Sequence, residues 1–448
     1  MVDVAESATA DDAPEGYRMT ELGVLPENWG VAHLADVAEF SKKERGADIT
    51  GSIPFIPMTL LPESGLYVDN WEDRTREEVR SGVYFRDGDL LLAKITPCLE
   101  NGKQGIARGI PGGWGYATTE VYPIHGTSVL TEYLAYYLRH QPVRNHLVDR
   151  MEGSTGRQRL PKSVVENLPI PLPPLPEQRA IAHVLSTVQR AREATEAVIA
   201  ATRELKRSLM RHLFTYGPVP VDQVAGVRLK ETEIGLVPED WKLETLRTLL
   251  REPLRNGHSA REATSSEGVR TLTLTAVTKN SFSILNTKIT VADASRVRDL
   301  WLSPGDILVE RANTKELVGL AALYEGPTGF AIFPDLMVRV RVDRARILEP
   351  FLTAYLVSSS CRAYFQRSAR GTAGNMPKID HGTIEGTTVP VPSLDEQESV
   401  RFALTTVDRK LAAEVARRAA LDDLFRTTLY NLMSGTLRVD VCSEPRCS

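Results

Sequence analysis

The chain has little cysteine, no long apolar run and a formal net charge of only −4. Four of its 448 residues are cysteine, and they lack the spacing of a metal site: Cys98, Cys361, Cys442 and Cys447. We therefore expect reduced thiols and a cytoplasmic protein. No apolar stretch approaches the roughly 20 residues that a membrane helix needs. Residues 1–14 have no basic start and no apolar core, so we expect a loose tail there and not a signal peptide.

The sequence also lacks the motifs of several enzyme classes. Gly102-Lys103 has neither the leading glycine nor the following Ser or Thr of a phosphate-binding loop. No glycine-rich dinucleotide turn follows a strand, and no Asn- or Asp-Pro-Pro-aromatic tetrad of an amino-methyltransferase occurs. The eight histidines form no H-x-x-x-H pair. We therefore expect a protein without catalytic activity of its own, while the small net charge still permits local basic surfaces.

What the sequence does contain is one long unit, present twice. Thr20–Trp29 returns as Thr232–Trp241, 212 positions later. Three further landmarks return at offsets of 217, 216 and 219: Asp87–Leu92 with Pro304–Val309, Pro161-Lys162 with Pro377-Lys378, and Leu175–Gln178 with Leu394–Gln397. At this length each half can form its own core. A duplicated unit predicts approximate two-fold symmetry and two similar surfaces for a bipartite partner.

Each unit begins with a mixed segment of strands and short helices. Strand-like runs rich in β-branched residues lie between glycine, proline and aspartate turns, at Gly88–Ile95, Thr119–Ile124 and Leu336–Val342. Short helices are expected at Thr131–His140 and at Pro350–Ser358. The mixture predicts an α+β fold.

Each unit then ends in a long amphipathic helix. The proline-rich stretch Pro169–Pro176 cannot be helical, so the first helix should begin near Glu177 and end at Gly217-Pro218, rising about 60 Å. Apolar or small residues recur there in steps of three and four, as in a coiled coil: Ile181, Val184, Val188, Ala191, Thr195, Val198, Thr202, Leu205 and Leu209.

The second long helix should run from Glu396 to Ser434-Gly435. Its seam is predicted at Val400, Leu404, Val407, Leu411, Val415, Leu421, Phe425, Leu429 and Leu432, with Glu414 and Arg418 falling near it. A long helix cannot bury its apolar stripe alone, so we expect the two helices to pair antiparallel. The alternative is that each helix packs on its own domain.

Two flexible basic loops lie at equivalent places, just before the proline-rich stretches. The loops Gly153–Lys162 and Arg367–Lys378 contain no acidic residue. Glycines allow backbone amides to approach phosphates, and Arg, Gln and Asn side chains can pair with purine edges in the major groove. The recurrence in both units predicts DNA contact, and the alternative is an ordinary polar loop.

A second set of candidates follows the Gly-Asp strand of each unit. In the first unit these are Lys94, Thr96, Asn101, Lys103, Gln104 and Arg108, and in the second they are Glu310, Arg311, Asn313, Thr314 and Lys315. Because the chemistry differs, two DNA-binding units would read different sequences; solvated surface is the alternative for each residue. Trp29 and Trp241 could stack on bases, but anchoring of each core is the favoured interpretation.

These motifs, in this order and duplicated, resemble the DNA-specificity subunit of bacterial type I restriction–modification systems. The resemblance runs from about Gly16 to Leu437. It implies two mixed α/β target-recognition domains separated by two long antiparallel coiled-coil helices. The implied segments are a disordered tail (1–15), a first recognition domain (16–172), a central spacer helix (173–217), a second recognition domain (218–392), a C-terminal spacer helix (393–437) and a tail (438–448).

The resemblance further implies that each domain reads one half of a bipartite site in double-stranded DNA. The long helices would dock two modification subunits that hold S-adenosylmethionine and methylate adenine N6. Restriction subunits that use ATP and Mg²⁺ would join where they are present, and this chain would hold no cofactor. The rival classes are a coiled-coil scaffold that does not read DNA and a self-sufficient nuclease or modification enzyme.

Family correspondence places particular residues in the two DNA loops. In the first domain they are Ser154, Thr155, Arg157, Gln158, Arg159 and Lys162, and in the second they are Arg370, Thr372, Asn375 and Lys378. The loops differ in sequence before their Pro-Lys pairs, so they do not superpose residue by residue.

Overall fold

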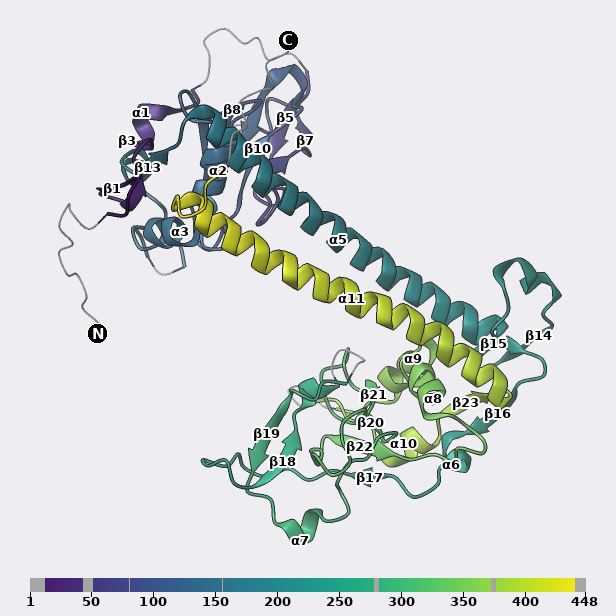
Figure 1. Cartoon of the computed structure of the whole chain (residues 1–448). Helices are drawn as coiled ribbons and strands as arrows, with labels where there is room; N and C mark the ends of the chain where they lie inside the picture. The colour runs from purple at the N-terminus through teal and green to yellow at the C-terminus, as the bar shows by residue number, and fades with distance from the viewer. Residues whose placement is uncertain are drawn as a thin grey trace, which may run out of the picture. The chain divides into compact units, whose positions relative to one another are not determined.

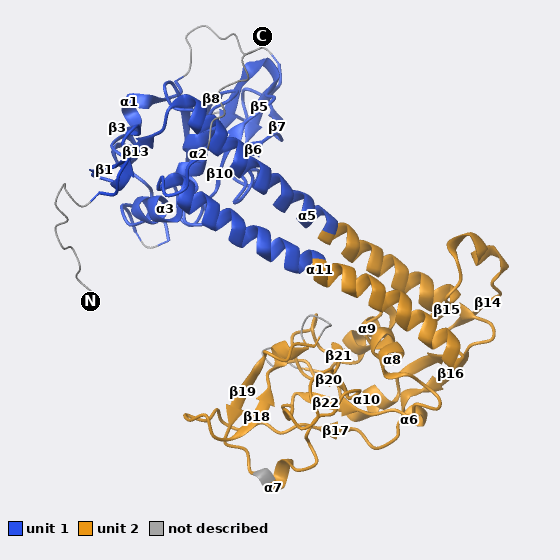
Figure 2. Cartoon of the chain, in the orientation of Figure 1, with its two compact units in different colours: residues 1–198, 414–448 blue, residues 199–413 orange. Residues whose placement is uncertain are grey.

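The computed structural model describes residues 13–42, 51–79, 81–154, 156–277, 282–371 and 376–439. Most of both predicted tails, with Cys442 and Cys447, lies outside these ranges. The chain forms two compact units (Figure 2). Unit 1 comprises residues 1–198 and 414–448, and unit 2 comprises residues 199–413. Both long helices contribute to both units, because the division falls inside each of them.

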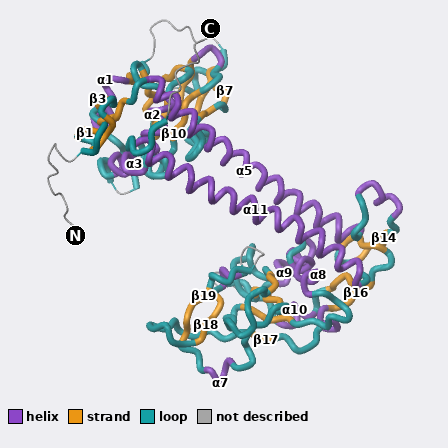
Figure 3. Tube along the Cα trace, viewed as in Figure 1, coloured by secondary structure: helices purple, strands orange, loops and turns teal. Residues whose placement is uncertain are grey.

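Unit 1 contains two hydrogen-bonded strand pairs and two larger sheets (Figure 3). The pairs are β1 (Tyr17–Thr20) with β2 (Gly23–Pro26), and β3 (Gly30–His33) with β13 (Pro169–Leu172). The five-stranded sheet has the order β4 (Ala38–Phe40), β12 (Val121–Gly126), β9 (Leu90–Ala93), β10 (Gln104–Ala107) and β6 (Tyr67–Val68). The four-stranded sheet has the order β7 (Glu72–Arg74), β5 (Ile53–Ile56), β11 (Trp114–Ala117) and β8 (Val83–Arg86).

Besides its parts of the two long helices, unit 1 contains four short helices in the described residues: α1 (Leu34–Val37), α2 (Thr131–Arg139), α3 (Gln141–Val148) and α4 (Lys162–Glu166). A 3-10 turn lies at Pro111–Gly113. The central strand β9 is buried on both faces. Leu90 and Leu92 pack with α2 and the long helices, whereas Leu91 packs with the four-stranded sheet. This alternation follows from the two-residue period of a strand.

Unit 2 repeats this plan with smaller sheets. Its strand pairs are β14 (Leu229–Thr232) with β15 (Gly235–Pro238), β16 (Lys242–Thr245) with β23 (Thr388–Val391), and β18 (Val269–Leu272) with β19 (Thr287–Thr290). Its main sheet has the order β17 (Arg255–Asn256), β22 (Met337–Val340), β20 (Ile307–Glu310) and β21 (Ala321–Leu323). Its short helices are α6 (Leu246–Leu249), α7 (Ala294–Val297), α8 (Glu349–Leu356), α9 (Ser359–Ser368) and α10 (His381–Glu385), with 3-10 turns at Val221–Gly226 and Leu274–Ala276.

The core of unit 2 is divided in the same way by its central strand. Ile307 and Val309 of β20 pack with α8, α9 and the long helices, and Leu308 packs with the β18 side. From β12 in unit 1 and β22 in unit 2 onward, the sequence repeat is therefore matched in chain order: three short helices, one strand and a long helix follow in the described residues of both units. The predicted α+β fold with a long helix ending each repeat is confirmed, as are the helices expected at Thr131 and Pro350.

The long helices are α5 (Leu175–Tyr216) and α11 (Leu394–Met433) (Figure 1). In unit 1, Arg192 Nε donates to Asp422 at 2.8 Å, and Glu196 pairs with Arg418 at 3.4 Å. As the α5 number rises by four, its α11 partner falls by four, which is the mark of an antiparallel pair. The predicted antiparallel pairing is therefore confirmed.

The predicted seam of α5 is confirmed at every second position, where Ile181, Thr195 and Thr202 are buried, and it differs by one residue at the positions between them. Ile181 is buried and Val184, Val188 and Leu209 are half-buried, but Val198 is 37% exposed and Leu205 is 56% exposed. The prediction was wrong for these last two residues. Buried side chains lie one position later at Leu185 and Ile199, and the same register places Arg192 and Lys206 on the seam.

The error has a physical cause. Arginine and lysine can bury an aliphatic stem while the charged end reaches a carboxylate, so they can occupy seam positions that an apolar pattern overlooks. On α11 the predicted seam residues are buried or half-buried apart from Val415, which is 45% exposed: Val400, Leu404, Val407, Leu411, Leu421, Phe425, Leu429 and Leu432. Glu414 and Arg418 lie near that seam, as expected.

The duplicated tryptophans are core residues. Trp29 and Trp241 are each 1% exposed, which confirms core anchoring over base stacking. The indole of Trp29 donates to Glu177 at 3.1 Å, and that of Trp241 donates to Glu396 at 3.0 Å. Each glutamate lies in the first turn of a long helix, so the tryptophan ties the start of its unit to that helix.

No helix in the described part of the chain combines the length and apolar character needed to cross a bilayer.

Candidate nucleic-acid interface

The first basic loop is closed at its base by backbone pairing. Glu152 and Arg159 exchange hydrogen bonds of 2.9 and 2.8 Å, which encloses residues 153–158. Ser154 and Arg157 are exposed there, and the turn uses left-handed glycines at 153 and 156. Thr155 lies outside the described residues. The loop therefore presents donors to solvent, as a nucleic-acid contact requires.

The same loop is joined to the segment after β9. The amide of Thr96 donates to Gln158 O at 3.1 Å, and the amide of Leu160 donates to Lys94 O at 2.8 Å. The two groups of candidates in unit 1, far apart in the sequence, thus lie side by side. Lys94 and Thr96 are half-buried at this junction.

Arg159 is held at the loop base by a carboxylate that sequence analysis missed. Its Nε and Nη2 donate to the two oxygens of Glu120 at 2.9 and 2.8 Å. These hydrogen bonds lower the pKa of Glu120 and raise the pKa of Arg159. The Arg159 side chain is nevertheless 55% exposed, and its Nη1 group has no partner among the described residues. Glu120 therefore fixes a guanidinium that can still donate outward.

The second basic loop has the same construction. Arg370 and Lys378 exchange two hydrogen bonds of 2.9 Å, and the amide of Ile379 donates to Arg311 O at 2.8 Å. Arg370, Lys378 and Lys315 are exposed, and Arg311 is half-buried. Thr372 and Asn375 lie outside the described residues.

These pairings correct the alignment of the two loops. Ile95 bridges to Arg159 in unit 1, and Ala312 bridges to Lys378 in unit 2, so Arg159 and Lys378 are the structural equivalents. Lys162 instead begins α4 and corresponds to His381, the first residue of α10. The sequence match of Pro161-Lys162 with Pro377-Lys378 is therefore misleading, because its offset of 216 differs by three from the offset of 219 that relates Arg159 to Lys378.

Two candidate side chains cannot read a base in this structure. Gln104 is 2% exposed, and its Nε2 donates to Ala135 O. Asn313 is 9% exposed, its amide nitrogen donates to Glu310 at 2.6 Å, and its amide oxygen accepts from Thr314 N. The predicted DNA contacts of Gln104 and Asn313 are wrong, because base readout needs a free amide edge.

The remaining candidates of that segment have different surroundings. Lys103 is half-buried and its ammonium donates to Met58 O at 3.0 Å, so it is engaged within its own unit. Asn101 is exposed in the turn between β9 and β10. Their contact with DNA stays a prediction.

Sequence analysis also missed a row of alternating cations and aromatic rings in unit 1. The Lys94 ammonium lies 4.7 Å from the Tyr122 ring centroid, and the Lys162 ammonium lies 4.1 Å from that of Phe40. The two rings meet edge to face at 5.6 Å. No local pattern could reveal this row, because the pairing of β4 with β12 brings Phe40 and Tyr122 together.

Among the described residues, no group of three or more His, Cys, Asp or Glu side chains is placed to hold a metal ion.

Comparison with known proteins finds similarity to one family over part of the chain. Residues 26–201 match the family described as "Type I restriction modification DNA specificity domain". The chain is a relative of type I restriction–modification specificity subunits. It is 36% identical over 166 residues to the type I restriction enzyme EcoEI specificity subunit of Escherichia coli, and 35% identical over 160 residues to the EcoAI specificity subunit. These alignments cover 36% and 35% of this chain, and the chain spans only 28% and 27% of the length of these two relatives.

A more distant relative matches along the whole length. The chain is 22% identical over 435 residues to the type I restriction enzyme MjaVIII specificity subunit of Methanocaldococcus jannaschii, which covers 93% of this chain and 94% of that protein. Among solved structures, the type I restriction–modification S subunit from M. genitalium has a TM-score of 0.55 at 14% identity, over 90% of this chain and 96% of that chain.

A second solved chain gives the same result. It comes from a study of complex assembly and conformational transition of the type I R-M system, and its TM-score is 0.56 at 15% identity, over 92% of this chain and 99% of that chain. At these identities the structural likeness establishes a common fold.

Proposed function

We propose that this chain is the sequence-reading subunit of a type I restriction–modification complex. Unit 1 and unit 2 each bind one half of a bipartite site in double-stranded DNA. The chain itself performs no chemistry, and two modification subunits with S-adenosylmethionine methylate adenine N6. Restriction subunits with ATP and Mg²⁺ join where they are present in the complex.

One observation carries this proposal. Each unit presents a basic loop, and each loop is tied by the same backbone pairing to the segment after its central strand. Arginine and lysine stand at equivalent positions, Arg159 in unit 1 and Lys378 in unit 2. Arginine donates through a rigid fork and lysine through a flexible point charge, so the two loops present different donor geometries to their half-sites.

The docking of partner subunits is assigned to the long helices. Apolar side chains on them remain exposed in unit 2, including Leu205 at 56% and Phe402 at 67%. Exposed apolar groups on a paired helix suit a protein partner.

The first test is the methylome of a host that expresses this chain with its modification subunits, compared with a deletion of this chain. We expect a bipartite N6-methyladenine motif that disappears with the deletion. An unchanged methylome, with the complex shown to assemble, would favour the scaffold interpretation.

The second test separates the half-sites. Arg159→Ala should relax recognition of one half-site by roughly 5- to 100-fold, and Lys378→Ala should relax recognition of the other half-site. Binding of the assembled complex is measured with DNA altered in each half-site in turn. Gln104→Ala is not a suitable control, because that side chain is buried. If both variants impair the same half-site, the assignment of one loop to each half-site is wrong.

A further inference from the structure

A pocket of about 390 Å³ lies beside the edge strand β4 of unit 1. Three cations and two carboxylates line it. Lys162 pairs with Glu166 at 2.6 Å, and Arg86 pairs with Glu39 at 2.6 Å. The third cation, Lys42, is exposed and has no hydrogen-bond or ion-pair partner among the described residues.

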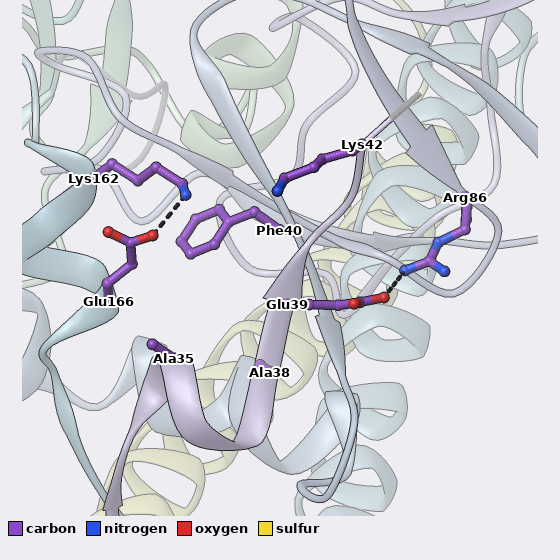
Figure 4. Close-up of a pocket in the computed structure, with 8 residues that line it drawn as sticks. All are labelled: Ala35, Ala38, Glu39, Phe40, Lys42, Arg86, Lys162 and Glu166. Carbon is purple, nitrogen blue, oxygen red and sulfur yellow. Dashed lines mark hydrogen bonds and ion pairs between the residues drawn. The ribbon is translucent and has the colours of Figure 1, made fainter. Parts of the chain in front are cut away.

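Among the described residues that line the pocket, the cations outnumber the carboxylates by one. Two of its cations are each matched by a carboxylate, which leaves Lys42. Figure 4 shows the Phe40 ring between the side chains of Lys42 and Lys162. An ammonium group on a flexible stem binds a phosphate as a point charge, and it needs no fixed fork geometry. The chemistry of the pocket therefore suits a single phosphate group.

The pocket is continuous with the proposed DNA loop. Lys162 follows Arg159 by three residues and lies over the ring of Phe40. Phe40 contacts Tyr122, and Tyr122 donates its hydroxyl hydrogen to Leu160 O at 2.8 Å. A phosphate held in this pocket would thus belong to the same DNA segment that meets the loop.

Unit 2 has a different surface at the equivalent place. Leu92 pairs with Tyr122 in unit 1, and Val309 pairs with Val338 in unit 2, so a buried valine replaces the tyrosine. The segment beside β22 there presents the carboxylate of Glu252, which pairs with Arg339 at 3.4 Å.

We propose that Lys42 and Lys162, on either side of the Phe40 ring, hold a backbone phosphate of the DNA next to the half-site read by unit 1. This inference rests on the proposed function and adds Lys42, which lies outside the predicted loops, to the predicted contact of Lys162. Phosphate contacts fix the register of a protein on the duplex and carry no sequence information directly. The pocket therefore strengthens binding without choosing bases.

The test is the salt dependence of DNA binding by the full chain assembled with its modification subunits. Lys42→Gln should reduce the slope of log affinity against log salt by about 0.9, the value for one lost phosphate contact. At low salt the affinity should fall roughly three- to tenfold, as for one net hydrogen bond. Discrimination between intact and altered half-sites should stay unchanged.

Arg76→Gln is the matched control. It removes the same charge from a side chain that, like Lys42, is exposed and has no hydrogen-bond or ion-pair partner among the described residues. Arg76 follows β7 at an edge of the four-stranded sheet, whereas Lys42 follows β4 at an edge of the five-stranded sheet. The control should keep the parental slope. Both substitutions are at the surface, so folding of the variants is checked by circular dichroism.

The outcomes distinguish this inference from the proposed function. A parental slope for Lys42→Gln, with half-site relaxation by Arg159→Ala, would overturn the pocket and leave the proposed function standing. Reduced slopes for Lys42→Gln and Arg76→Gln alike would show that positive charge anywhere on the surface of unit 1 matters, which also overturns the pocket. Absence of sequence-specific binding by the parental complex would overturn both.

Discussion

A Glu-Gln pair lies in the first turn of each long helix, Glu177-Gln178 in α5 and Glu396-Gln397 in α11. The glutamate of this pair makes different contacts in the two units. In unit 2, Glu396 forms a capping box with Ser393: the Ser393 amide donates to the carboxylate at 3.0 Å, and the Glu396 amide donates to Ser393 Oγ at 3.3 Å. In unit 1 the corresponding residue before the helix is proline, and Glu177 instead receives two hydrogen bonds from Arg438, at 2.6 and 2.9 Å.

By contrast, the glutamine of each pair makes the same contact in both units. Gln178 accepts from Leu130 N at 2.8 Å, and Gln397 accepts from Leu348 N at 2.8 Å. Each thereby connects the start of a long helix to the start of a short one, α2 or α8. The contact between the long helix and the short helix is therefore present in both units. The local helix cap is present in unit 2, and in unit 1 an ion pair with the C-terminal segment takes its place.

This difference shows that the start of the long helix depends on residues far away in the sequence in unit 1, but on neighbouring residues in unit 2. The cap in unit 2 is made within four residues, whereas Glu177 depends on a residue 261 positions later. Tyr17 also donates to Gly435 O at 3.1 Å, so unit 1 uses the segment after α11 in two contacts. The loops differ likewise, because Leu336 occupies in unit 2 the position of Glu120 in unit 1.

The largest loss of stability is expected from substitution of the tryptophans, which occupy equivalent positions in the two units. Trp29→Ala and Trp241→Ala should each cost about 3–5 kcal/mol of stability, the usual loss for truncating a buried aromatic side chain. Hydrogen exchange followed by mass spectrometry reports the two units separately. Trp29→Ala should accelerate exchange in unit 1 and Trp241→Ala in unit 2. A loss below about 1 kcal/mol in either unit would contradict core anchoring.

Removing the partners of Glu177 and Glu396 should cause intermediate losses of stability, each in a different unit. Arg438→Gln leaves Glu177, which is 4% exposed, with only the indole of Trp29, and should destabilise unit 1 by about 1–3 kcal/mol. Ser393→Ala removes the helix cap of α11 and should destabilise unit 2 by about 0.5–2 kcal/mol. The same exchange measurement applies. Faster exchange in unit 2 after Arg438→Gln would show that the ion pair is not specific to unit 1.

The smallest effect is expected on the seam of the long helices. Arg192 is 13% exposed, pairs with Asp422 and lies 4.6 Å from the Phe425 ring centroid, so Arg192→Ala should destabilise unit 1 by about 1–2 kcal/mol. The pair of Lys206 with Asp408 is 27% and 48% exposed, so Lys206→Ala should cost less than about 1 kcal/mol. Denaturant unfolding of the full chain, followed by hydrogen exchange, compares the losses of stability in the two variants. Equal losses would contradict the difference in burial.

The sequence alone determined the repeat, the mixture of strands and short helices, and the long helix that ends each unit. These follow from local signals: proline stops, three–four spacing and alternating strands. It also determined that Trp29 and Trp241 are core residues. It did not determine the seam register, because Arg192 and Lys206 do not belong to an apolar pattern.

Only the tertiary structure decided which candidates share a surface. Backbone pairing made Arg159 the equivalent of Lys378, against the sequence match, and burial removed Gln104 and Asn313 from the interface. Strand pairing brought Phe40, 82 residues away, against Tyr122. The physical reason is that periodicity fixes the face of an element, whereas the groups that meet across faces are set by packing between residues distant in the chain.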